Sequence, residues 1–205
     1  MRIQPQASIL LIAAILALAG CGTPRCIQKT SLQTGPPEGK AIINVYGYYV
    51  APWPVFLEGK TLVAMPNQHT VSQLVVEPGE HTLLLRYDVN DRAAAITVST
   101  SANHTYDIIA DSVISWGDAS SYTNFGKFGR YLYLKPVPAS GSVRGELTKR
   151  LNSFSATTID RSDPKVAQME QEYAADNAAV LAEFRAGKKI DDAGLQTLAA
   201  DQYRR

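Results

Sequence analysis

Short apolar runs broken by turn residues fill the middle of this 205-residue chain. Eight such runs are rich in β-branched and aromatic residues, which favour strands, and they lie at 41–50, 55–57, 62–65, 71–76, 81–87, 93–100, 105–110 and 131–134. Apolar residues alternate within several of them, and no helical periodicity competes. Seven or eight short strands with turn signals between them are typical of a small β-sandwich. The sequence therefore predicts a mainly β fold, a small antiparallel β-sandwich over 41–137.

The spacing of apolar residues becomes helical in the last fifth of the chain. Residues 138–162 are rich in Ser, Thr and Gly and are expected to be a linker before a helical segment, 163–205. Ser162-Asp163-Pro164 is typical of an N-cap followed by a proline in the first turn. One apolar stripe follows at three-, four- and seven-residue steps, formed by Val166, Met169, Tyr173, Val180 and Phe184.

Gly187 is expected to end this helix, and a second short helix is expected from Asp191 or Asp192 to Tyr203. A narrow apolar stripe on a helix has two possible partners. It can pack on the chain's own sandwich, or it can join two copies of the chain into a homo-oligomer. Both alternatives stay open at this point.

The N-terminus has the pattern of a secretory signal. Arg2 precedes a nearly unbroken apolar run from Ser8 to Leu18, and small residues follow it. The run is too short to span a bilayer comfortably, which takes roughly 20 apolar residues. We expect a cleaved signal peptide over residues 1–20; an uncleaved anchor is the alternative.

Leu18-Ala19-Gly20-Cys21 resembles the lipobox of bacterial lipoproteins. The resemblance implies cleavage between Gly20 and Cys21 and acylation of Cys21, whereas an ordinary signal peptide would carry this cysteine by chance. Two or three acyl chains make a stable membrane anchor, which one chain does not. By the same resemblance, Gly22 stands where an Asp would favour the inner membrane. We therefore expect an outer-membrane lipoprotein whose domain faces the periplasm, with the inner membrane as the weaker alternative.

The segment after the lipobox is poor in hydrophobic residues. Residues 21–40 contain several prolines and glycines, and we expect a disordered tether with a reach of roughly 24 Å. Cys26 is the only cysteine besides Cys21, and we expect it to be an unpaired thiol within that tether.

The net charge of the mature chain bears on whether it binds nucleic acid or an anionic membrane surface. Loss of Arg2 with the signal peptide leaves 19 basic and 19 acidic residues, so the mature chain has no net formal charge. A nucleic-acid-binding protein would carry a basic patch, and a polybasic segment would help membrane binding. We expect no nucleic-acid partner, and the acyl chains are the one evident attachment to the membrane.

Two turn motifs carry a resemblance to the DUF2846 family. Val55-Phe-Leu-Glu-Gly-Lys60 resembles the apolar-x-apolar-Asp/Glu-Gly-Lys hairpin of that family, and 77–83, Glu-Pro-Gly-Glu-His-Thr-Leu, resembles its Pro-Gly-Lys/Glu-His-Thr segment. Asn103-His104-Thr105-Tyr106 stands where the family tends to have Gly-x-Thr-Tyr, so the glycine is missing here. The resemblance covers 41–115. It implies a domain carried by bacterial lipoproteins and brings no known activity and no catalytic residues.

Two aromatic groups are candidates for a ligand surface. Tyr46 and Tyr48 share a strand face by two-residue periodicity, and Trp53 follows closely. The second group lies in a long Gly-rich loop and consists of Trp116, Tyr122, Phe125 and Phe128. Loops of that length are uncommon unless they are functional or disordered. Packing against the body is the structural alternative for both groups.

Chemistry-bearing residues are sparse. The three histidines, His69, His81 and His104, stand apart from one another without the spacing of a metal site. Asp107 and Asp111 are expected to be solvated groups at a strand edge. We expect no cofactor, no metal and no catalysis, but a binding or scaffolding surface for a protein or glycan partner. The alternative is a lipid-anchored hydrolase or carbohydrate-processing enzyme with its site near the loop from Trp116 to Phe128.

Overall fold

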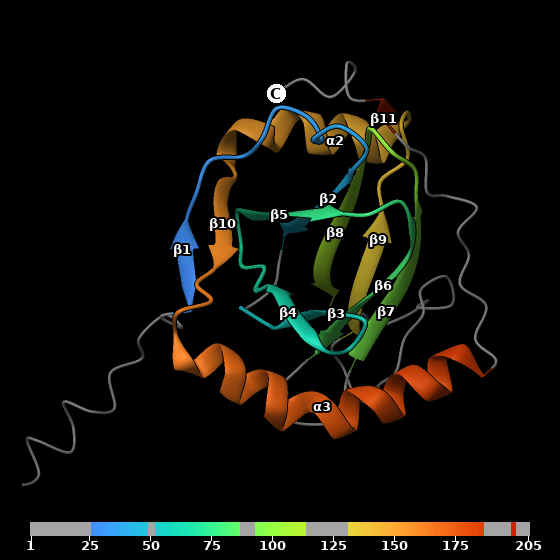
Figure 1. Cartoon of the computed structure of the whole chain (residues 1–205). Coiled ribbons are helices and arrows are strands. Elements are labelled where there is room, and N and C mark those ends of the chain that lie inside the picture. The colour runs from blue at the N-terminus through green and yellow to red at the C-terminus, as the bar shows by residue number, and fades with distance from the viewer. Residues whose placement is uncertain (1–25, 49–51, 87–92, 114–130, 187–197, 200–205) are drawn as a thin grey trace, which may run out of the picture.

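The computed structural model describes residues 26–48, 52–86, 93–113, 131–186 and 198–199. Two facing sheets form the body of the molecule, and a helix lies at each of two opposite ends in the view of Figure 1. The mainly β architecture with a long C-terminal helix is therefore confirmed.

The larger sheet has seven strands in the described part of the chain. Its main path runs in the order β1 (Ile27–Lys29), β10 (Ser155–Ile159), β5 (Thr70–Val76), β2 (Ala41–Gly47), β8 (His104–Val113) and β11 (Leu198–Ala199), and β9 (Tyr131–Pro136) also pairs with β8. The pairs β2–β8 and β10–β5 are parallel, while the others are antiparallel. The prediction of a purely antiparallel fold is therefore wrong for this sheet. Long crossover connections between the paired strands allow the parallel pairs.

The smaller sheet is antiparallel throughout. Its order is β4 (Thr61–Ala64), β3 (Val55–Leu57), β6 (Gly79–Arg86) and β7 (Ala93–Thr100). Alternate residues of both sheets meet in one apolar core, which includes Ile43, Val45, Val55, Leu83, Leu85, Val98, Tyr106 and Ile108. The two-residue periodicity of the sequence reflects this core because successive side chains on a strand point to opposite faces.

Helix α3 (Pro164–Arg185) covers the outer face of the smaller sheet. Leu181 and Phe184 pack against Leu84, Ala93 and Ala95. Val166, Met169 and Tyr173 pack against Phe56 and Leu62, among other residues. The predicted stripe is thus covered within the chain. Asp163, not Ser162, is the N-cap, and its side chain accepts a hydrogen bond from the Lys165 amide at 2.9 Å.

Two segments expected to be irregular contain regular structure. From Cys26 onward the predicted tether is part of the folded body, because β1 pairs with β10 in the register Ile27 with Ile159. The predicted linker contains α2 (Ser142–Arg150), the 3₁₀ turn η1 (Leu151–Ser153) and β10. These elements are short and carry few large apolar residues, so pairing with distant strands determines them rather than their own pattern.

Of the predicted second helix the structure describes only Leu198–Ala199, and these two residues are not helical. Leu198–Ala199 form strand β11, which pairs antiparallel with the start of β8. Strand pairing along the edge of β8 here prevails over local helix propensity. Gly187 and the rest of 187–197 lie outside the described residues, and α3 itself ends at Arg185.

Candidate functional site

The tyrosines of the first predicted ligand group lie together on the outer face of the larger sheet. Tyr46 is fully buried, and its ring meets the Phe154 ring edge-on at a centroid distance of 5.1 Å. Tyr48 is half-buried and lies 5.7 Å from the same ring, and His69 lies 6.2 Å from it. We call these four residues the Phe154 cluster. Two-residue periodicity predicted that Tyr46 and Tyr48 share a face, but nothing near them in sequence indicated Phe154.

Burial decides what the Phe154 cluster can do. Tyr46 offers no exposed surface on which a sugar or peptide ring can stack. The guanidinium of Arg150, at the end of α2, lies 5.3 Å from the centroid of the Tyr48 ring, a cation–π geometry. Arg150 thus already covers one face of Tyr48. The cluster fastens α2 and η1 to the sheet, which is a structural role.

Trp53 does not join this cluster. It is 7% exposed and belongs to the core between the two sheets. The predicted platform of Tyr46, Tyr48 and Trp53 therefore is not formed, because the sheet itself separates the tryptophan from the tyrosines. The second predicted group, Trp116, Tyr122, Phe125 and Phe128, lies outside the described residues, as does the hydrolase site expected there.

A buried polar network lies beside the Phe154 cluster. Asp107 and Asp111 are 1% and 6% exposed, so the expectation of solvated edge carboxylates is wrong. They lie on β8, which is flanked by β2 on one side and β9 on the other. Local sequence patterning does not indicate that these carboxylates are buried, because strand order is a long-range property.

Both carboxylate oxygens of Asp107 have partners. Asn44 Nδ2 donates to Oδ1 at 2.8 Å, and Arg144 Nη1 of α2 forms an ion pair with Oδ2. The same guanidinium donates to the carbonyls of Pro138 and Val137 at 3.0 and 3.2 Å. A buried carboxylate with such a complete set of partners holds helix and sheet together.

The histidines are not gathered into a site. His81 and His104 each bond a nearby main-chain carbonyl at 2.7 Å, those of Glu77 and Ala102. Within the described residues, no group of three or more His, Cys, Asp or Glu side chains is arranged to hold a metal ion.

Cys26 is a free cysteine whose thiol is buried. It is fully enclosed, and its Sγ lies 3.3 Å from the Met65 sulfur. Burial raises the pKa of this thiol above its ordinary value of 9.0, and the charges of Asp163 and Asp160 act in the same direction. The thiol is thus held in its protonated, weakly nucleophilic form. The prediction of a thiol in a tether is wrong.

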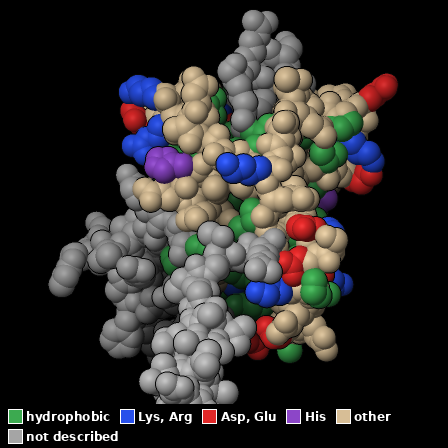
Figure 2. All heavy atoms as spheres, turned by 90° about the vertical axis from the view of Figure 1, so that its left-hand side faces the viewer, with side chains coloured by type: hydrophobic (Ala, Val, Ile, Leu, Met, Phe, Trp, Pro, Cys, Tyr) green, Lys and Arg blue, Asp and Glu red, His purple; other side chains and the backbone are tan. Residues whose placement is uncertain are grey.

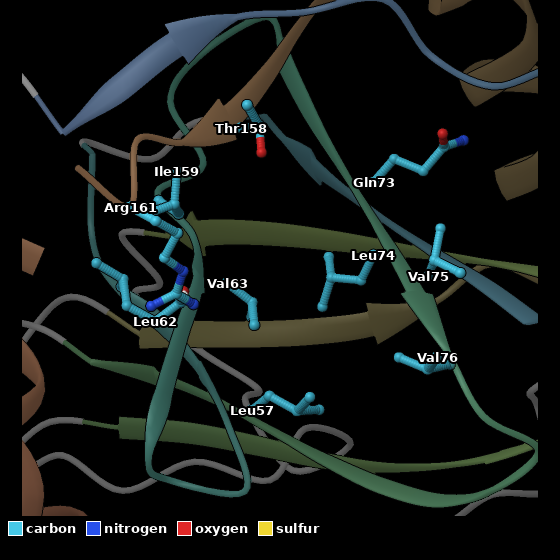
Figure 3. Close-up of a pocket in the computed structure, with 10 residues that line it drawn as sticks. All are labelled: Leu57, Leu62, Val63, Gln73, Leu74, Val75, Val76, Thr158, Ile159 and Arg161. Carbon is cyan, nitrogen blue, oxygen red and sulfur yellow. Dashed lines mark hydrogen bonds between the residues drawn. The ribbon is translucent and has the colours of Figure 1, made fainter. Parts of the chain in front are cut away.

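One pocket of about 220 Å³ opens between the edges of the two sheets (Figure 3). Aliphatic side chains from β3, β4, β5 and β10 line most of it, and Gln73, Thr158 and Arg161 supply the polar side chains. No local sequence signal predicted it, because β10, which is distant in the chain, joins the consecutive strands β3, β4 and β5 to form its walls.

The face that carries β1 and β10 shows acidic and basic side chains interspersed over its described part (Figure 2). Such mixing agrees with the balanced charge of the sequence. In the part of the chain that the structure describes, no helix has the length and hydropathy needed to cross a bilayer.

Three comparisons with known proteins found no similar protein. No family model matches the chain, and neither a curated protein nor a solved structure matches it. The resemblance to the DUF2846 family accordingly stays a prediction that depends on the turn motifs alone.

Proposed function

We propose that the protein is a bacterial envelope lipoprotein, attached to the outer membrane through acyl chains on Cys21, whose two-sheet body presents a binding or scaffolding surface in the periplasm. One observation supports this proposal above the others. Cys26, five residues after the lipobox cysteine, is already buried in the described body. A lipid anchor at Cys21 would therefore hold the body directly at the bilayer.

The number of residues between Cys21 and Cys26 limits the distance between the bilayer and the body. Five extended residues span at most about 17 Å, compared with roughly 24 Å for the flexible tether expected from sequence. The Cys26 carbonyl accepts a hydrogen bond from the Asp160 amide at 2.8 Å, which fixes the first described residue to the body. The region around Cys26 and the start of α3 is then the part of the body closest to the membrane.

A DUF2846-like β-sandwich is the domain we propose for this body. The hairpin that carries Glu58-Gly59-Lys60 joins β3 and β4, and Glu58 and Gly59 both have positive φ, 53° and 67°. Two such residues are typical of the tight turn that the resemblance implies. A domain of that family would contribute binding and no known catalysis.

Membrane fractionation of cells tests the proposal, and the chain supplies its own control. We expect Cys21→Ala to release the protein from the membrane fraction, since the acyl chains are the proposed attachment. Cys26→Ala removes the other cysteine and should leave the protein in the membrane fraction. Membrane attachment that survives Cys21→Ala refutes the lipid anchor.

A further inference from the structure

The two halves of α3 are held to the smaller sheet in different ways (Figure 1). In the first half, Glu170 Oε1 accepts a hydrogen bond from the Leu62 amide at 2.8 Å and forms an ion pair with Arg161 at 2.5 Å. Val166 is buried in the apolar cluster of Phe56 and Leu62. Large apolar side chains and polar groups with partners therefore fix this half to the sheet.

The second half, Tyr173–Arg185, makes a thinner apolar contact. Leu181 and Phe184 are its buried apolar side chains, and they pack against Leu84, Ala93 and Ala95. Because two of these three partners are alanines, the sheet offers less apolar area here than Phe56 and Leu62 offer to the first half. The hydrophobic contribution to holding this half is correspondingly smaller.

Buried polar atoms without partners lie beneath the same half. Asn177 is fully buried, and its Nδ2 donates to the Gly59 carbonyl at 2.9 Å, but its Oδ1 has no partner. Arg86 of β6 is buried next to Asp176, and its Nε and Nη1 also lack partners. Such atoms have given up their hydrogen bonds to water without replacement. Separation of helix and sheet would return water to all three.

The ion pair at the helix end is a weak fastening. Arg185 Nη2 lies 3.2 Å from Glu58 Oε2, and the two side chains are 61% and 39% exposed. Water screens a pair of this kind, so it adds little to the attachment.

We propose that the second half of α3 is a lid that detaches from the smaller sheet while the first half and the two-sheet body stay folded. Segments held by few buried apolar contacts open at a lower free energy than global unfolding requires. Detachment would uncover the outer face of the smaller sheet around Leu84, Ala95 and Arg86. The lid is independent of the binding role proposed above and of the anchor at Cys21.

Thiol labelling at two adjacent positions of β7, in the full chain in detergent, tests the lid. Ala95→Cys places a thiol beneath α3, whereas Ala94→Cys, the matched control, places one in the core between the sheets; both alanines are buried. Opening of the lid exposes the first position alone, but global unfolding exposes both. We expect Ala95→Cys to react with iodoacetamide at least about tenfold faster, as read from each labelled peptide by mass spectrometry. Equal rates would overturn the proposal.

Arg86→Met, made in the Ala95→Cys chain, tests the cause of opening. It should slow labelling by about tenfold, because the closed lid then buries no unpaired guanidinium atoms. Arg185→Met, which changes the exposed pair, should alter the rate by less than about threefold. A rate that Arg86→Met leaves unchanged would contradict the proposal.

Hydrogen exchange of the unaltered chain gives a test without new cysteines. Amides of residues 177–184 should exchange at least about tenfold faster than those of residues 168–172 and of β2. The same protection in all three segments would refute the lid. Neither result bears on the membrane fractionation of Cys21→Ala, so the two proposals fail separately.

Discussion

Arg144 reaches from α2 to a carboxylate that the larger sheet buries completely. Its guanidinium joins Asp107 to the carbonyls of Val137 and Pro138. Removal of the arginine would leave an uncompensated buried charge. We expect Arg144→Ala to lower the free energy of unfolding by about 3–5 kcal/mol in a urea titration.

Lys149 provides the matched control on the same helix. It pairs with Glu146 at 2.8 Å, but both side chains are more than half exposed. Lys149→Ala should change stability by about 0.5 kcal/mol or less, because water screens such pairs. Equal losses for the two variants would show that the Asp107 network does not hold α2 in place.

Cys26 makes stability depend on alkaline pH. Burial raises the pKa of its thiol in the folded chain above 9.0, the value of an ordinary thiol. Below pH 9.0 both states keep the proton, but above it the unfolded chain ionises first, so the free energy of unfolding falls as pH rises. Urea titrations at pH 7.5 and pH 10 should show a larger loss for the unaltered chain than for Cys26→Ala. A loss of the same size in both would contradict the buried thiol.

At the scale of elements, the contact between α3 and the smaller sheet contains a poorly satisfied arginine, Arg86. Arg86 is 3% exposed, and its Nε and Nη1 have no hydrogen-bond partner. Its Nη2 lies 3.9 Å from Asp176, whose side chain is 66% exposed, and its guanidinium lies 5.7 Å from the Tyr173 ring. These contacts compensate only part of the cost of burying the charge.

Arg86→Met should therefore stabilise the protein, because methionine has a similar length and no polar atoms to satisfy. We expect a gain of about 1–2 kcal/mol in the free energy of unfolding. Arg185→Met is the control, since it changes an exposed arginine at the end of α3. It should change the free energy of unfolding by less than about 0.5 kcal/mol. A loss of more than about 1 kcal/mol for Arg86→Met would show that this guanidinium supports the fold.

The elements also show what sequence patterning can and cannot reveal. The strands β2 to β9 each correspond to a predicted apolar run, because each contributes alternate residues to a core. β1, α2 and β10 were missed, since distant partners rather than internal patterning hold them. Tyr46 and Tyr48 were correctly placed on one face, but the Phe154 ring that covers them comes from a segment expected to be a linker.

At the scale of the whole molecule, the described chain begins where β1, the end of β10 and the start of α3 meet (Figure 1). With the anchor proposed at Cys21, this corner would lie within about 17 Å of the bilayer.

Intact mass spectrometry of the protein extracted from membranes tests whether Cys21 carries the lipid anchor. We expect a mature chain that begins at Cys21 and carries acyl chains on that residue, with an excess mass that disappears when the acyl groups are removed. A mature chain that begins at another residue, or an unmodified Cys21, would contradict it.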